Sequence, residues 1–153
     1  MKLNSTDRKI LALVQADSSL SYAAIGAEVA LSVSAVNERV RKLERGGAIR
    51  RYVAVLDPAI VGAEVLAFLE IALDQPADGK AVLNAALARP EVQEIHRISG
   101  EAQYLLKLRL TSLGELQATV DEILALAGAR QTRLTLALGT VKEQPDVPIA
   151  ASV

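Results

Sequence analysis

The sequence predicts an α+β fold of two units, a helix-turn-helix unit of the winged-helix kind and a βαββαβ, ferredoxin-like unit, joined by a hinge strand. Three observations support this prediction. Apolar residues recur at helical spacing in three short segments before residue 46, the composition turns β-branched after Ala48, and strand-like and helix-like segments then alternate to residue 141. A chain of 153 residues is long enough for two small domains.

The first unit is predicted to contain helices near residues 4–16, 21–30 and 32–45. Capping residues precede each helix: Asn4, Ser5 or Thr6 for the first, Ser21 for the second, and Ser32 or Ser34 for the third. The third helix is expected to bury one stripe, formed by Val33, Val36, Val40 and Leu43, and to end at Gly46 and Gly47. Its opposite face is polar and largely basic.

The rest of the chain predicts a sheet covered by two helices. The β-branched run 49–56 is the predicted hinge strand, and it stops at Asp57-Pro58. The later elements are expected at 65–73 (strand), 76–88 (helix, opened by Pro76), 92–99 and 104–110 (strands), 112–126 (helix) and 130–141 (strand). The predicted boundaries are therefore 1–50 for the helix-turn-helix domain, 51–62 for the hinge and linker, 63–143 for the βαββαβ domain and 144–153 for a tail.

Two features of this second domain bear on partners and on catalysis. Its first and last strands carry apolar residues on both faces, which indicates that a second subunit covers the sheet. His96, the one histidine, should share a strand face with Val92, Glu94 and Ile98 by alternation, where a structural role is expected.

Composition excludes several classes of protein. The chain has no cysteine, which removes disulfides, thiolate metal sites and cysteine nucleophiles. No window approaches ~20 uncharged apolar residues, and the N-terminus lacks the apolar run of a signal peptide. We therefore expect a cytoplasmic protein without a membrane span.

The charge of the chain is divided unequally between its parts. Residues 1–52 carry nine Lys and Arg against five Asp and Glu, a net charge of +4, whereas the remainder carries eight against thirteen, a net charge of −5. A basic part in a chain of net charge −1 indicates a nucleic-acid or other anionic partner for that part.

The third helix has the properties of a recognition helix in the major groove of DNA. Small and polar side chains in its first half can reach base edges, and cations further along can neutralise phosphates. The predicted DNA-binding residues are Ser32, Ser34, Ala35, Asn37, Glu38, Arg39, Arg41, Lys42 and Arg45, with Arg50 and Arg51 as further phosphate contacts. The alternative is a three-helix module whose charged face is only solvated.

Several segments resemble one known family. The run 31–44, followed by Gly47-Ala48-Ile49, is similar to the helix-turn-helix of the Lrp/AsnC (leucine-responsive, or feast-famine) transcription regulators, and 52–58 resembles their hinge strand. Segments 90–100 and 104–108 resemble the middle of their effector domain, and Thr132-Arg133 with 141–143 resembles its last strand. The resemblance implies a nucleoid-associated regulator that binds double-stranded DNA as a homodimer and assembles into a tetramer or an octamer of dimers.

The resemblance also implies a small-molecule effector, usually an amino acid, bound between subunits, with no cofactor. The corresponding residues here are Ser99, Gly100, Glu101, Ala102, Gln103 and Tyr104 in one loop and Leu134, Thr135 and Leu136 in the last strand. Gln103 stands where many members have aspartate, which removes the charge-assisted part of a bond to an α-ammonium. Leu134 replaces a common threonine, and Glu101 is a candidate substitute acid.

Two alternatives to an effector-controlled regulator remain open. Some relatives with the same two-domain plan decarboxylate sirohaem, which requires histidine and basic residues around a large pocket, and this chain has one histidine. No catalytic motif or set of metal-spaced ligands is present, so neither catalytic nor metal-binding residues are predicted. The other alternative is a regulator whose second domain serves only for assembly.

Overall fold

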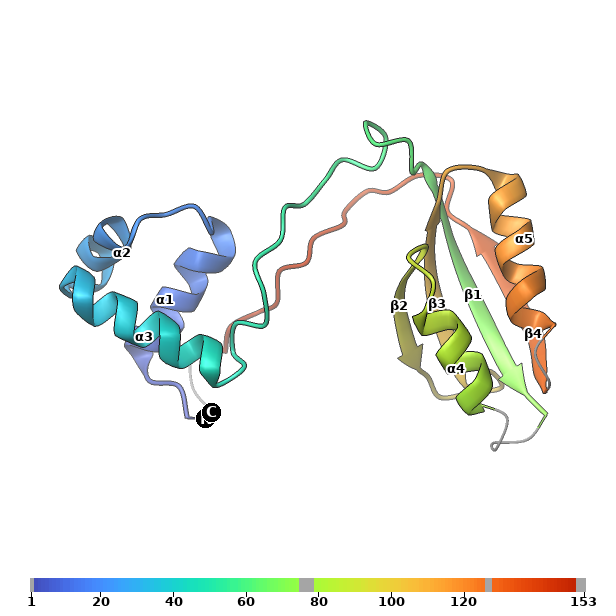
Figure 1. Cartoon of the computed structure of the whole chain (residues 1–153), viewed down its shortest axis with the longest axis horizontal. Helices are drawn as coiled ribbons and strands as arrows, with labels where there is room; N and C mark the ends of the chain where they lie inside the picture. Colours follow the sequence, from blue (N-terminus) through green and yellow to red (C-terminus); the bar gives the residue numbers. More distant parts are fainter. Residues whose placement is uncertain (1, 75–78, 126–127, 151–153) are drawn as a thin grey trace. The chain divides into compact units, whose positions relative to one another are not determined.

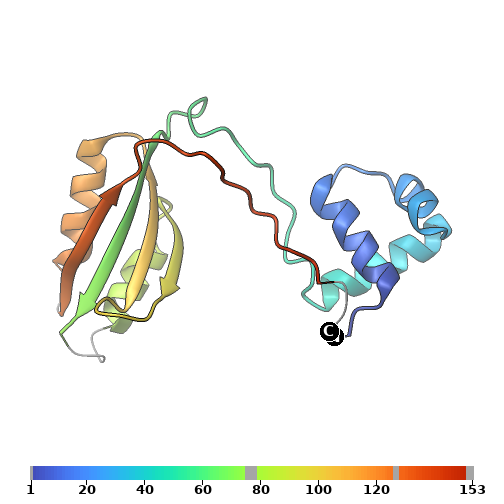
Figure 2. The ribbon, with the colours of Figure 1, turned by 180° about the vertical axis from the view of Figure 1, so that it is seen from behind.

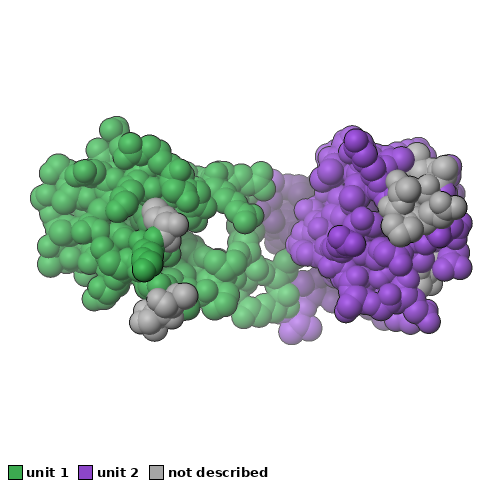
Figure 3. Space-filling view, turned by 90° about the horizontal axis from the view of Figure 1, so that it is seen from below, with its two compact units in different colours: residues 1–55, 142–153 green, residues 56–141 purple. Residues whose placement is uncertain are grey.

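The computed structural model describes residues 2–74, 79–125 and 128–150. The chain divides into two compact units, one formed by residues up to 55 together with those from 142 onward, and the other by residues 56–141. Figure 3 shows them in green and purple. The polypeptide therefore enters the second unit after Val55 and returns to the first after Val141.

The first unit contains three helices, α1 (Ser5–Ala16), α2 (Tyr22–Val29) and α3 (Val33–Arg45) (Figure 1). Each begins at a capping side chain that the sequence offers. The side-chain oxygens of Asn4, Ser21 and Ser32 accept hydrogen bonds from the backbone N–H three residues ahead. Gly46 caps the end of α3, and Gly47 has a φ of +73°, which confirms the predicted stop.

The three helices enclose a small apolar core, formed by Ile10, Ile25, Val36, Val40 and Leu43. The predicted stripe of α3 is thus confirmed except at Val33, which is 53% exposed. Val33 is the first residue of α3 and lies one turn before the part of the helix that packs against the core, so its burial was wrongly predicted.

The second unit is the predicted βαββαβ fold. Its elements are β1 (Val65–Leu73), α4 (Gly79–Leu87), β2 (Val92–Arg97), β3 (Tyr104–Leu110), α5 (Leu113–Leu124) and β4 (Ala129–Leu136). The strands form one sheet in the order β2-β3-β1-β4, and all neighbours are antiparallel. The helices lie on one face of the sheet, behind the strands in Figure 2.

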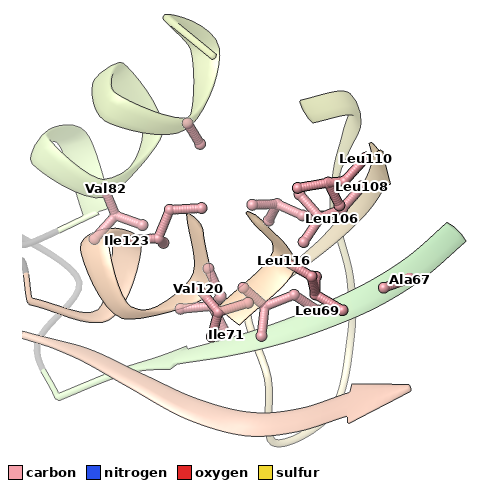
Figure 4. Close-up of a cluster of buried hydrophobic side chains, with 11 residues drawn as sticks. Ala67, Leu69, Ile71, Val82, Leu106, Leu108, Leu110, Leu116, Val120 and Ile123 are labelled. Atoms are coloured by element: carbon pink, nitrogen blue, oxygen red, sulfur yellow. The ribbon is translucent and has the colours of Figure 1, made fainter. Parts of the chain in front are cut away.

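The core of this unit lies between the helices and the inward side chains of the central strands (Figure 4). Leu69 and Ile71 of β1 and Leu106 and Leu108 of β3 are fully buried against Val120 and other residues of the helices. β3 buries every second residue, Leu106, Leu108 and Leu110, whereas β1 also buries Leu66 and Ala72, as expected for a strand with apolar residues on both faces.

The strand ends differ from their predicted positions for local reasons. β2 stops at Arg97, two residues early, because the chain then turns towards Gly100. β4 stops at Leu136, five residues early, because it pairs with Ala67 of β1, near the start of that strand. The predicted helix start at Pro76 lies outside the described residues.

The hinge strand predicted at 49–56 is not formed in the described chain. Tyr52, Val53 and Val55 are 49%, 56% and 71% exposed, and the segment joins no ladder. A strand needs a partner for its backbone groups, and β propensity alone does not supply one.

The alternation predicted around His96 is interrupted by a bulge. The register between β2 and β3 shifts between Val92 and Glu94, so Val92 packs against the core while Glu94 and His96 are exposed. The imidazole Nε2 of His96 lies 2.9 Å from Glu94 Oε2.

The open face of the sheet is partly apolar. Leu66 and Phe68 lie there, paired across the strands with Arg109 and Lys107. Leu66 is nevertheless 7% exposed and Phe68 is half-buried. Long neighbouring side chains therefore shield part of the face for which the sequence predicts a second subunit.

Candidate nucleic-acid interface

The turn between α2 and α3 determines where α3 begins. α2 ends at Ala30, whose φ of 53° and ψ of 48° are left-handed, and the Leu31 N–H then donates to the Gly26 carbonyl at 3.0 Å. A Cβ on Gly26 would lie 2.5 Å from the Leu31 oxygen. The tight turn therefore requires glycine at this position. Helical spacing did not predict this requirement, although a glycine inside a short predicted helix was an available signal.

The solvent face of α3 brings most of the predicted DNA-binding residues together. Ser32, Ser34, Glu38, Arg41, Lys42 and Arg45 are exposed, and Ala35 and Asn37 are half-buried. A shallow hollow of ≈ 350 Å³ lies on this face, lined by Ser34, Asn37, Glu38, Arg41, Glu44 and Arg45. Ser32 also caps the helix by accepting from the Ala35 N–H, and its hydroxyl lies 3.1 Å from that of Ser34.

Arg39 differs from the other predicted cations because it binds inside the unit. Its Nη1 donates to Oδ1 of Asp7 at 2.8 Å, and the two side chains are 33% and 5% exposed. Arg41, Lys42 and Arg45 are exposed by comparison, and Arg45 Nε donates to the Arg41 carbonyl at 3.3 Å. The structure therefore separates Arg39 from the exposed cationic group.

A second polar contact joins the end of α3 to the segment that follows it. The Tyr52 hydroxyl donates to Oε1 of Glu44 at 3.0 Å. Partial burial, and then the hydrogen bond and negative charge of Glu44, raise the pKa of Tyr52 to about 12. Arg50 and Arg51, in the same segment, are exposed.

The loop predicted to bind an effector is connected to β1 through Gln103. Its Oε1 accepts from the Leu73 N–H at 2.7 Å, its backbone N–H donates to the Ile71 carbonyl at 2.9 Å, and its Nε2 donates to the Glu101 carbonyl at 3.4 Å. Gly100 has a φ of +115°, which favours glycine.

The other residues of the loop differ in exposure. Ser99, Gly100 and Glu101 are exposed, Ala102 is buried and Tyr104 is half-buried. The loop thus presents its first half, up to Glu101, to solvent.

The two halves of the predicted effector site do not meet within one chain. Leu134, Thr135 and Leu136 belong to β4, and β1 lies between β4 and β3. Two strand spacings amount to about 10 Å. Leu134 is paired with Leu69 and packs against the core, whereas Thr135 and Leu136 are exposed.

The described part of the chain contains no group of three or more His, Cys, Asp or Glu side chains placed to hold a metal ion. None of the helices in residues 2–74, 79–125 and 128–150 has the length and apolar composition needed to cross a membrane.

Two family models match the chain. Residues 3–50 match a winged helix-turn-helix DNA-binding model, and residues 66–147 match the Lrp/AsnC ligand binding domain. The first match contains α1, α2 and α3, and the second contains all four strands of the sheet except Val65, the first residue of β1.

Relatives of known name cover most of the chain. The leucine-responsive regulatory proteins of Salmonella typhimurium and Escherichia coli K12 are 38% and 37% identical over 144 residues, which is 92% of this chain and 88% of theirs. An L-methionine complex of a transcriptional regulator from Neisseria meningitidis is 28% identical, with a TM-score of 0.88 over 95% of this chain and 96% of that one. The leucine response regulatory protein of Mycobacterium tuberculosis is also 28% identical, with a TM-score of 0.84 over 95% and 100% of the chains.

Proposed function

This chain belongs to the Lrp/AsnC family of transcription regulators, which join a helix-turn-helix DNA-binding domain to a ligand-binding domain. From this premise, we propose that α3 is the helix that recognises the operator. Base edges in the major groove are contacted by the side chains that follow the Ser32 cap in the first half of α3: Ser34, Ala35, Asn37 and Glu38. Arg41, Lys42 and Arg45, with Arg50 and Arg51, hold the phosphates. The observation that carries this assignment is the exposed face of α3, where Ser34, Asn37, Arg41 and Arg45 line one hollow together with Glu38 and Glu44.

Fluorescence anisotropy on the full chain tests this proposal. The protein is titrated into duplex DNA from upstream of its own gene and into a scrambled duplex, at several salt concentrations. We expect submicromolar binding with preference for the upstream duplex. Arg41→Ala should weaken binding and reduce the slope of log K against log salt by about 0.9, because one phosphate contact is lost. An unchanged slope would exclude a phosphate role for Arg41.

We also propose an amino acid or a related small molecule as effector, bound between subunits. The solved complex of a similar regulator holds L-methionine, and in one chain the loop and the β4 residues are separated by β1. A dimer, or a tetramer or octamer of dimers, would complete the site.

The anisotropy titration repeated with each of twenty amino acids tests whether an amino acid is the effector. Glu101→Gln tests whether Glu101 replaces the missing aspartate. Unchanged effector affinity in that variant would remove Glu101 from the site.

A second candidate is a regulator whose ligand-binding domain serves only for assembly. It is favoured by two contacts: the Gln103 side chain is already bonded to the backbone of β1, and Leu134 is packed against the core. Specific DNA binding that no amino acid alters would favour this candidate. The named relatives are transcription regulators and not enzymes, so the decarboxylase alternative is set aside. We propose that the protein acts on the cytoplasmic nucleoid.

A further inference from the structure

One carboxylate joins the start of α1 to the middle of α3. Asp7 lies in the first turn of α1 and is 4% exposed. Its Oδ2 accepts from the Asn4 N–H at 3.2 Å, while its own N–H donates to Asn4 Oδ1 at 2.8 Å. Its Oδ1 accepts from Arg39 at 2.8 Å. Both carboxylate oxygens are therefore used, one to cap α1 and the other to hold α3.

The position of Arg39 on α3 explains why it reaches α1. At ~100° per residue, Arg39 lies about 60° from Val36, the centre of the buried side, whereas Arg41 and Arg45 lie about 140° and 180° away. If Arg39 turned to a DNA phosphate, a buried carboxylate would lose its cation, and an uncompensated buried charge is strongly unfavourable. The pair with Asp7 is thus the stable state of Arg39 whether DNA is bound or free.

We infer that Arg39 is a positioning residue for DNA recognition and not a phosphate contact. Through Asp7 it fixes the rotation of α3 about its own axis and its position along α1, and so aims Ser34, Asn37 and Glu38 at the bases. The inference rests on the proposed function of α3, and it replaces the phosphate role that the sequence suggested for Arg39.

Salt dependence separates the two roles of Arg39. With Arg39→Gln we expect specific affinity to fall by about tenfold, the size typical for loss of a charged hydrogen bond. The slope of log K against log salt should stay at the wild-type value, because no phosphate contact is lost. Arg41→Ala is the matched control, since it removes an exposed cation and should lower the slope. A slope reduced by about 0.9 in Arg39→Gln would overturn the inference.

The two possible roles of Arg39, phosphate contact and positioning residue, predict opposite effects of Asp7→Asn on DNA affinity. If Arg39 bound phosphate, removing its intramolecular partner would leave affinity unchanged or increase it. If Arg39 positions α3, Asp7→Asn should weaken specific binding, with a smaller loss for the scrambled duplex, so that discrimination between the two falls. The double variant Asp7→Asn/Arg39→Gln should bind about as well as either single variant, because both remove one contact. Unweakened binding by Asp7→Asn, or additive losses, would overturn the inference.

Two controls separate a loss of folding from a loss of positioning. Circular dichroism sets a temperature at which every variant is folded. Arg39→Lys keeps a cation that can reach Asp7, so it should recover part of the lost discrimination between the upstream and scrambled duplexes. The wild-type titration reports on the proposed function separately. If the wild type does not prefer any operator fragment, the proposed function fails and this inference fails with it. If the wild type prefers the upstream duplex and Arg39→Gln lowers the slope of log K against log salt, this inference alone fails.

Discussion

Gln15 in α1 and Val147 near the carboxyl end exchange two hydrogen bonds. Gln15 Nε2 donates to the Val147 carbonyl at 3.0 Å, and the Val147 N–H donates to Gln15 Oε1 at 3.2 Å. Arg8 of the same helix donates to the Ala150 carbonyl. Part of the predicted tail is therefore bound to the helix-turn-helix unit, because one amide side chain satisfies both polar groups of a backbone residue.

Gln15→Ala should release this segment. We expect faster amide hydrogen exchange at residues 144–150 and a loss of stability below about 1 kcal/mol, because the bonds are solvent-exposed. Gln117→Ala is the control, since Gln117 bonds to Asp121 within α5. Equal exchange in both variants would show that Gln15 does not hold the segment.

Gln103→Ala should destabilise the second unit by about 1–2 kcal/mol, because the Leu73 N–H loses its acceptor. Gln103→Glu retains an acceptor oxygen and should remain closer to wild type. Urea unfolding of the two variants measures the difference. Equal loss in both would mean that the bond to Leu73 contributes nothing.

Gly26→Ala should disturb the turn before α3. The added Cβ would lie 2.5 Å from a backbone oxygen, so we expect a loss of about 1–3 kcal/mol and weaker DNA binding. Gly114→Ala in α5 is the control. Its nearest neighbour is Ser112 Oγ at 3.9 Å, and alanine there should stabilise the helix by up to about 1 kcal/mol. Thermal unfolding compares the two, and similar shifts would contradict the steric argument.

Tyr52 should affect stability at alkaline pH. Because its pKa is raised from 10.0 to about 12 in the folded chain, its contribution is complete below pH 10 and is lost as the pH rises towards 12. The free energy of unfolding of the Tyr52→Phe variant should therefore depend less on pH in this interval. The variant should also lack the tyrosinate absorbance that develops near pH 12. Glu44→Gln should shift that absorbance to lower pH. If the wild type shows no late-ionising component, the Tyr52–Glu44 contact does not form.

Local signals in the sequence are sufficient for most of the fold. Asn4, Ser21 and Ser32 are caps that act within one helical turn, and Gly46 with Gly47 ends α3 without help from distant residues. Burial of every second residue in β3 follows from the alternation of leucine with Lys107 and Arg109. The helix-turn-helix, the βαββαβ order and the exposed face of α3 were predictable because each depends on neighbours close in sequence.

Contacts between residues far apart in sequence were decided only by the tertiary structure. Arg39 and Arg41 are chemically alike and two residues apart, yet one binds Asp7, 32 positions away, and the other faces solvent. Gln103 bonds to β1 across 30 positions, and Gln15 to Val147 across 132. The run 49–56 has strand propensity but no partner in the described chain. Sequence determined the elements and their faces, since these depend on local spacing; the tertiary structure decided which polar side chains are already paired, because pairing depends on which segments the fold brings together.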